Sequence, residues 1–206
     1  MIDHARDLQS LDEATERLIA AVTELDNAAV SEPSRLPGWS RGHVLAHIAR
    51  NADALGNVLA GLPMYESAEA RDADIERDAA RTAAVQLDDV RDSAARFRAG
   101  AALPADWSRT VTLRNGVTDS AALIPFRRWA EVALHHVDLD IGYELHDLPA
   151  EFTEREIDFL RQRFSADPTV AEVTGPPVAL LGWLSGRSDG RGLKAPGDTL
   201  PVLPPL

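Results

Sequence analysis

Apolar residues recur at helical spacing along most of this chain. In the first segment, roughly residues 3–27, leucine and valine return every three or four positions, which is the pattern of an amphipathic helix. A stretch rich in helix stoppers follows at residues 31–38. Ser40 is then a good N-cap for a second helix, which we expect to run to about Gly61.

The middle of the chain changes character twice. A third, highly charged helix is predicted over about residues 68–98. The stretch Trp107-Ser-Arg-Thr-Val-Thr-Leu-Arg is rich in β-branched residues, and the tight-turn dipeptide Asn115-Gly follows it, which indicates a short hairpin or an irregular crossover. A fourth helix is predicted from about Ala122 to His146. Four long helices with connections of differing length favour a four-helix bundle.

The composition shifts after this fourth helix. Residues 151–165 have the pattern of one more helix, and a further helical turn or two around residues 178–185 lies among glycines and prolines. The sequence therefore predicts a mainly α protein with two domains. These are the bundle, residues 1–147, and a small C-terminal α or α/β lobe, residues 148–206.

Composition and charge exclude several classes of function. The chain has 206 residues, 45% of them apolar, which is typical of a soluble globular protein. Its net charge of −12, without any run of Lys or Arg, argues against binding to nucleic acid or to anionic membranes. We expect a cytoplasmic protein, because we find neither a secretory signal nor an apolar run long enough to span a membrane. Because the chain has no cysteine, any thiol chemistry must come from a separate small molecule.

Three residues form a candidate metal site. Glu131 and His135 stand four apart, so they share one face of the fourth helix, and His47 lies in the second helix. Two imidazoles and one carboxylate that leave a position open are the catalytic form of zinc coordination, although nickel or iron would also accept these ligands. Glu131 and His135 share one stripe of this helix with Asp138 and Gly142. Aliphatic residues flank this Glu131 stripe on both sides, which points it into the bundle, where unpaired polar groups are costly.

Spacing alone leaves a plainer interpretation open. Glu and His four residues apart often form a simple pair on a helix surface. A histidine beside an apolar face is often a core residue whose ring nitrogens are hydrogen-bonded within the protein. His43, one turn before His47, is a weaker candidate ligand. Asp138 could orient a ligand or belong to a polar network, and Asn51 could bind a ligand or bridge two helices.

Three stretches of the chain resemble the mycothiol-dependent maleylpyruvate isomerase family, a branch of the DinB-like bundle proteins. They are Leu36-Pro-Gly-Trp-Ser-Arg-Gly-His-Val-Leu-Ala-His-Ile-Ala-Arg-Asn-Ala-Asp, Met64-Tyr-Glu-Ser-Ala-Glu-Ala-Arg-Asp-Ala-Asp-Ile and Arg128-Trp-Ala-Glu-Val-Ala-Leu-His-His-Val-Asp-Leu. The resemblance covers roughly residues 1–147. It implies that His47, Glu131 and His135 bind zinc, the same three residues that helix geometry indicates.

The resemblance also implies an activity. Mycothiol, a small thiol, would bind as its thiolate at the open zinc position and add to the cis double bond of maleylpyruvate. Rotation and elimination would then release the trans product, fumarylpyruvate. Arg71 is similar to the family's substrate-binding arginine, and Arg187 to an arginine of its C-terminal domain implicated in activity, although each also fits a solvated surface or loop arginine. Asn51 and Arg187 are the candidates for contact with the thiol. The strands expected of that C-terminal domain are largely missing, so we expect a shortened lobe.

Three functions therefore compete. The leading hypothesis is a zinc-dependent, mycothiol-using isomerase of maleylpyruvate. A mycothiol S-transferase would use the same activated thiolate but retain the carbon–sulfur bond with its electrophile. The third is a non-catalytic bundle that serves as a binding module and holds no metal.

Overall fold

The fold is mainly helical, as the sequence predicts. The computed structural model describes residues 3–103 and 106–204. Within these ranges the first helices and strands are α1 (His4–Thr23), α2 (Asn27–Ser31), α3 (Arg41–Leu59), α4 (Ala68–Ala79), α5 (Ala83–Ala101), β1 (Thr110–Thr112), β2 (Thr118–Ser120) and α6 (Ile124–Asp138). They are followed by α7 (Ala150–Arg163), α8 (Thr169–Glu172) and α9 (Pro177–Leu184). Among the residues that the structure describes, none of the helices combines the length and the hydropathy that a membrane span requires.

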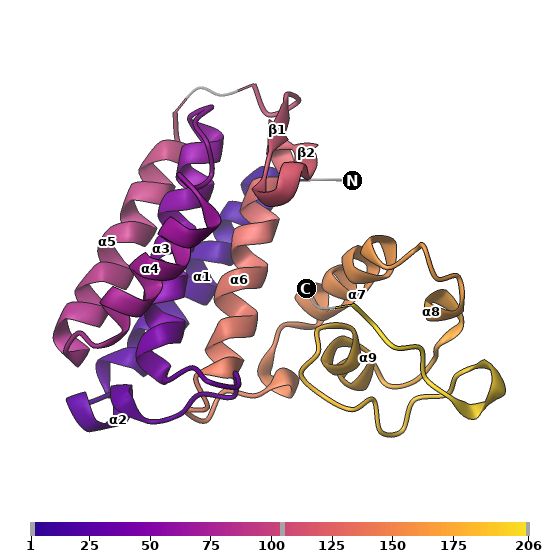
Figure 1. The fold of residues 1–206 in the computed structure, drawn as a ribbon. Helices are drawn as coiled ribbons and strands as arrows, with labels where there is room; N and C mark the ends of the chain where they lie inside the picture. The colour runs from indigo at the N-terminus through magenta and orange to yellow at the C-terminus, as the bar shows by residue number, and fades with distance from the viewer. Residues whose placement is uncertain (1–2, 104–105, 205–206) are drawn as a thin grey trace. The chain divides into compact units, whose positions relative to one another are not determined.

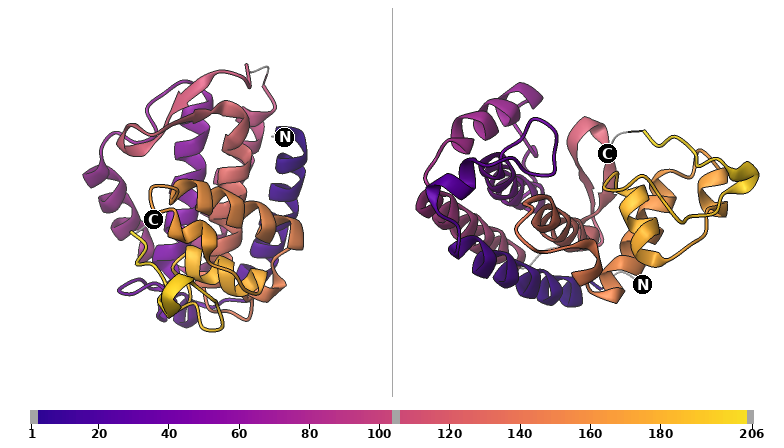
Figure 2. Two further views of the ribbon diagram at one scale, coloured as in Figure 1. Left: turned by 90° about the vertical axis from the view of Figure 1, so that its right-hand side faces the viewer. Right: turned by 90° about the horizontal axis from the view of Figure 1, so that it is seen from below.

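The chain divides into two compact units, one ending at Gly142 and the other beginning at Tyr143. In the first unit α1, α3, α5 and α6 pack side by side, and α4 lies against α3 (Figure 1). Figure 2 shows the same helices in two further views. The second unit is built on the packing of α7 against α9. The domain boundary after residue 147 stays a prediction.

Helix α3 is the centre of the first unit because it contacts α4, α5 and α6. Leu45 and Ile48 have no exposed surface. Gly42, near the start of the helix, lets α4 approach closely: a β-carbon placed there would stand 2.2 Å from the carbonyl oxygen of Ala79. Ser40 caps the helix, with its hydroxyl accepting from the His43 amide and its own amide donating to the His43 ring, which confirms the predicted N-terminus.

The single long helix predicted over residues 68–98 is wrong. The structure has two helices there, α4 and α5, with a break at Ala80–Thr82. The buried side chain of Gln86 explains the break, because its amide donates to the carbonyls of Asp78, at 2.8 Å, and Ala79, at 3.3 Å, near the end of α4. The tertiary contact satisfies carbonyls that a continuous helix would have used itself.

The fourth predicted helix begins where expected but ends too late. Helix α6 stops at Asp138, eight positions before the expected end, and Asp140 has the left-handed φ of 54°. Gly142, which we expected on the Glu131 stripe, therefore lies outside the helix. The expected hairpin is confirmed, since β1 and β2 pair antiparallel and Asn115 in their connection has a φ of 59°.

Candidate metal centre

Helices α3 and α6 face each other at the candidate site because Arg41 ties the start of one to the end of the other. Its guanidinium donates to the carbonyl oxygens of Leu139, at 2.8 Å, and Asp140, at 3.0 Å. These carbonyls lie just beyond the last turn of α6, where helical partners are missing. The contact fixes the lengthwise register of the two helices. His47, less than two turns into α3, is thereby held opposite the last turns of α6.

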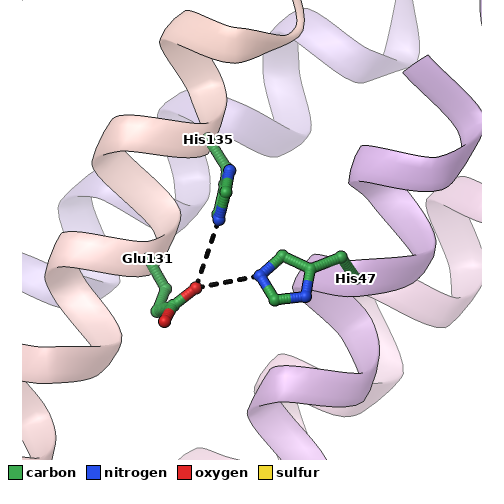
Figure 3. Close-up of side chains that lie close together, drawn as sticks. All are labelled: His47, Glu131 and His135. Carbon is green, nitrogen blue, oxygen red and sulfur yellow. Dashed lines mark hydrogen bonds and ion pairs between the residues drawn. The ribbon is translucent and has the colours of Figure 1, made fainter. Parts of the chain in front are cut away.

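His47, Glu131 and His135 come together in the structure. Figure 3 shows both imidazoles directed at one carboxylate oxygen: Glu131 Oε2 lies 3.0 Å from His47 Nε2 and 3.3 Å from His135 Nε2. The two rings stand edge to face, with centroids 4.6 Å apart. His47 is 7% exposed, whereas a third of the Glu131 side chain is accessible. The cluster is thus partly open on the Glu131 side.

The donor set fits a divalent transition metal. One ligand atom from each residue can be chosen so that all three lie within 4.8 Å of one another. Atoms that bind one zinc ion stand about 4 Å apart or less, since each bond is about 2.0–2.2 Å long. Small rotations of the three side chains would bring their ligand atoms to the spacing that one zinc ion requires. Two imidazole nitrogens and one carboxylate oxygen also match the ligand preference of zinc, nickel and iron, and they leave a coordination position free.

The protonation states of His47 and Glu131 also suit a metal. Burial lowers the pKa of His47 and favours its neutral imidazole, the form that binds metal. Burial would raise the pKa of Glu131, but hydrogen bonds with the imidazoles of His135 and His47 outweigh it and lower the pKa well below its usual value. For His135, burial is outweighed by hydrogen bonds with Asp138 and Glu131, so its pKa is raised and a metal has to displace a proton from this ring. The carboxylate is therefore ionised at neutral pH.

Asp138 supports the outer nitrogen of His135. Its Oδ2 lies 2.8 Å from Nδ1 of His135, and the residue has no exposed surface. A carboxylate in this position fixes ring orientation and makes Nε2 a better ligand. Of the two roles we left open for Asp138, the structure favours orienting a ligand.

The change Asp138→Asn should therefore weaken zinc binding about 10- to 100-fold, because the neutral amide cannot polarise His135 in the same way. The change should leave the helical circular dichroism spectrum in place. Competition with a chromophoric chelator measures the affinity, and an unchanged value would remove Asp138 from the centre.

His47 has a different outer partner. Arg71 Nη2 lies 3.2 Å from His47 Nδ1, and its Nη1 donates to Asp72 at 2.6 Å. A guanidinium can only donate, so Nδ1 of His47 accepts, and the proton of the neutral ring sits on Nε2, facing Glu131. The Arg71 guanidinium is 6.0 Å from the ring centroid of Tyr65, whose pKa is raised, chiefly by burial. Arg71 and Tyr65 thus bring a cation and a neutral phenol to the cluster.

Asn51 and Arg128 form the next layer of the bundle. Asn51 stands four residues after His47 on α3, and its Oδ1 accepts from Nη1 of Arg128 at 2.9 Å. Both residues are 2% exposed. The amide thus bridges two helices, one of the two roles that the sequence leaves open. Sequence reasoning missed Arg128, although its position three residues before Glu131 was a usable signal.

Two other predicted residues have different surroundings. His43 uses Nδ1 in the cap with Ser40, and its Nε2 lies 3.3 Å from Oε2 of Glu76. His43 is therefore not one of the clustered ligands. Arg187 belongs to the second unit, just after α9, where its Nη1 donates to the carbonyl oxygen of Ser185 at 3.0 Å. Its contact with thiol or substrate stays a prediction.

Comparisons with known proteins give one family match by sequence and two solved structures of similar fold. Residues 11–140 match the family model described as the mycothiol maleylpyruvate isomerase N-terminal domain. Two crystal structures of mycothiol-dependent maleylpyruvate isomerase, one of them a histidine-to-alanine mutant, have a similar fold, each with a TM-score of 0.85 and 22% sequence identity. Each match covers 99% of this chain and 97% of the other, so the second unit is included. No curated protein matches the sequence.

Proposed function

The chain belongs to the mycothiol maleylpyruvate isomerase N-terminal domain family, and on this premise we propose that it is a metal-dependent enzyme that converts maleylpyruvate to its trans isomer with mycothiol as co-substrate. The observation that carries the proposal is the convergence of His47, Glu131 and His135 from two helices. Zinc is the proposed metal, with nickel or iron as substitutes. A cytoplasmic location is proposed with it.

The site can bind a metal that activates a thiol, but the chain contains no thiol of its own. The chain has no cysteine, so the nucleophile comes from a separate molecule, for which we propose mycothiol. When bound by His47, Glu131 and His135, the metal would lower the pKa of a thiol at its free position and keep it as thiolate at neutral pH. The partly open side of the cluster, at Glu131, is the proposed approach for that thiol.

The proposed reaction is an addition followed by an elimination. The thiolate forms a carbon–sulfur bond at the cis double bond of the substrate, and the electron pair of that double bond moves toward the adjacent carbonyl. The remaining single bond rotates. Return of the electron pair then breaks the carbon–sulfur bond, which releases the trans product and regenerates the thiolate. The reaction consumes neither oxidant nor thiol.

Arg71 is the proposed partner of the substrate's negative charge. Its hydrogen bond to Nδ1 of His47 requires the ring proton to be on Nε2. When Nε2 is a metal ligand, the neutral ring carries its proton on Nδ1 instead and no longer accepts from Arg71. The guanidinium then needs another acceptor, and a substrate carboxylate provides one. Arg187 remains a proposed anion-binding residue of the second unit.

Incubation of the zinc-loaded protein with mycothiol and maleylpyruvate tests the function. We expect the ultraviolet spectrum of the trans product to develop with catalytic amounts of thiol, and chelator-treated protein to be inactive. A mass-detected thiol adduct that consumes mycothiol stoichiometrically would instead support the S-transferase. Metal-loaded protein that gives neither product nor adduct would contradict both enzymatic proposals and favour the non-catalytic bundle.

A further inference from the structure

Arg128 is a cation inside the bundle of an acidic protein. It lies on α6, three residues before Glu131, and only 2% of its surface is exposed. Burial lowers its pKa to about 10, so the guanidinium still carries its charge at neutral pH. A buried charge is costly unless hydrogen bonds and an opposite charge compensate it.

The charge of Arg128 is only partly compensated by other residues of the protein. Within residues 3–103 and 106–204, Arg128 makes one hydrogen bond, to Asn51 Oδ1, and no ion pair within 4 Å. A guanidinium has five N–H groups. The nearest acidic groups already have partners, since Glu131 is shared by two imidazoles and Asp53 is paired with Arg96 at 2.8 Å and with Arg50 at 3.5 Å.

The position of Arg128 relates it to the metal centre. Arg128 and Glu131 are one turn apart on α6, and Asn51 and His47 are one turn apart on α3. The Arg128–Asn51 pair is therefore the layer of the bundle next to the three ligands. Asn51 accepts a hydrogen bond from Nη1 of Arg128. The edge of the guanidinium formed by Nε and Nη2 has no hydrogen-bond partner among the described residues. Two parallel N–H groups at such an edge match the two oxygens of a carboxylate.

We propose that Arg128 is a substrate-binding residue, whose Nε–Nη2 edge holds a carboxylate of an unsaturated cis-dicarboxylate next to the metal centre. The inference rests on the proposed function and assigns a residue to its substrate. Asn51 is a positioning residue, because it orients the guanidinium and does not itself touch the substrate. Arg71, which is hydrogen-bonded to His47, would be the second guanidinium next to the ligands, so that each end of a dicarboxylate has one partner.

Binding of maleate to the zinc-loaded protein, without thiol, tests this role separately from turnover. Calorimetric titration of the wild type should show binding. Arg128→Met should bind maleate about 10- to 100-fold more weakly, because hydrogen bonds to a charged group are lost. Arg128→Lys keeps the charge without the paired N–H groups and should recover only part of the affinity. Arg127→Met is the matched control: Arg127 neighbours Arg128 on the same helix but pairs with Asp119 at 2.6 Å, so its loss should leave maleate affinity unchanged.

The outcomes separate this inference from the function on which it rests. If Arg128→Met retains zinc and binds maleate like the wild type, Arg128 is only a helix bridge and the inference fails while the function stands. If Arg128→Met does not fold, Arg128→Lys decides, since full affinity for maleate in that variant contradicts a paired carboxylate contact. A wild type that neither binds maleate nor isomerises maleylpyruvate would instead overturn the proposed function.

Discussion

Replacement of His135 by alanine is expected to remove both the bound metal and the affinity for thiol. The imidazole is one of three donors that converge from α3 and α6, and its Nε2 lies 3.3 Å from Glu131 Oε2. Loss of groups that merely support a ligand already weakens metal binding about 10- to 100-fold, so loss of a ligand itself should exceed about 100-fold. Metal analysis of the purified variant and a thiol titration followed by calorimetry measure the two effects.

His43→Ala is the control for this change. His43 is also an imidazole of the first unit, but it belongs to the N-terminal cap of α3 and to a contact with Glu76. This variant should lose some thermal stability through the cap and retain its metal. A His135→Ala protein that still holds one metal per chain and binds thiol would show that the three side chains are not the ligands.

Gly42→Ala should produce a large loss of stability in the first unit. The added methyl would stand 2.2 Å from the backbone oxygen of Ala79, so α3 and α4 must separate. Overpacking of this kind costs about 1–3 kcal/mol, and a backbone atom has little freedom to yield. Because α4 carries Arg71, maleate binding should weaken as well. Urea unfolding of the metal-free protein measures the stability without the added effect of metal binding.

Gly56→Ala on the same helix is the matched control. No atom outside the local backbone lies within 4 Å of its added β-carbon, and the position is helical. Alanine is a better helix former than glycine by up to about 1 kcal/mol, so this variant should be equally or more stable. If both variants unfold at the same urea concentration, close packing at Gly42 does not limit the approach of the two helices.

The sequence predicts the parts of the site that depend on local pattern. The serine cap of α3 and the four-residue spacing of Glu131 and His135 place three side chains on two helix faces, and the structure has both helices there. What local pattern cannot supply is the fit between helices. Their alignment depends on Arg41, whose guanidinium reaches carbonyls about a hundred positions away in the chain.

The two errors in the predicted helix boundaries have the same origin. At the break between α4 and α5, the side chain of Gln86 donates to the carbonyl oxygen of Asp78. At the early end of α6, the side chain of Arg41 donates to the carbonyl oxygen of Leu139. Gln86 is only eight positions from Asp78 but also donates to the carbonyl of Gly42 on α3, and Arg41 acts across about a hundred positions. A periodic pattern of apolar residues contains neither contact. Arg128 was overlooked for a related reason, since an arginine between aromatic and charged neighbours resembles a surface residue until α3 covers it.

X-ray absorption at the zinc edge of the loaded protein tests the central claim most directly. If two helices hold the ion from three sides, the spectrum should contain two imidazole nitrogens at about 2.0–2.1 Å and a carboxylate oxygen at about 2.0–2.2 Å. His47→Ala should lose one of the two imidazole contributions. A spectrum with oxygen neighbours alone, or one that His47→Ala leaves unchanged, would contradict the claim.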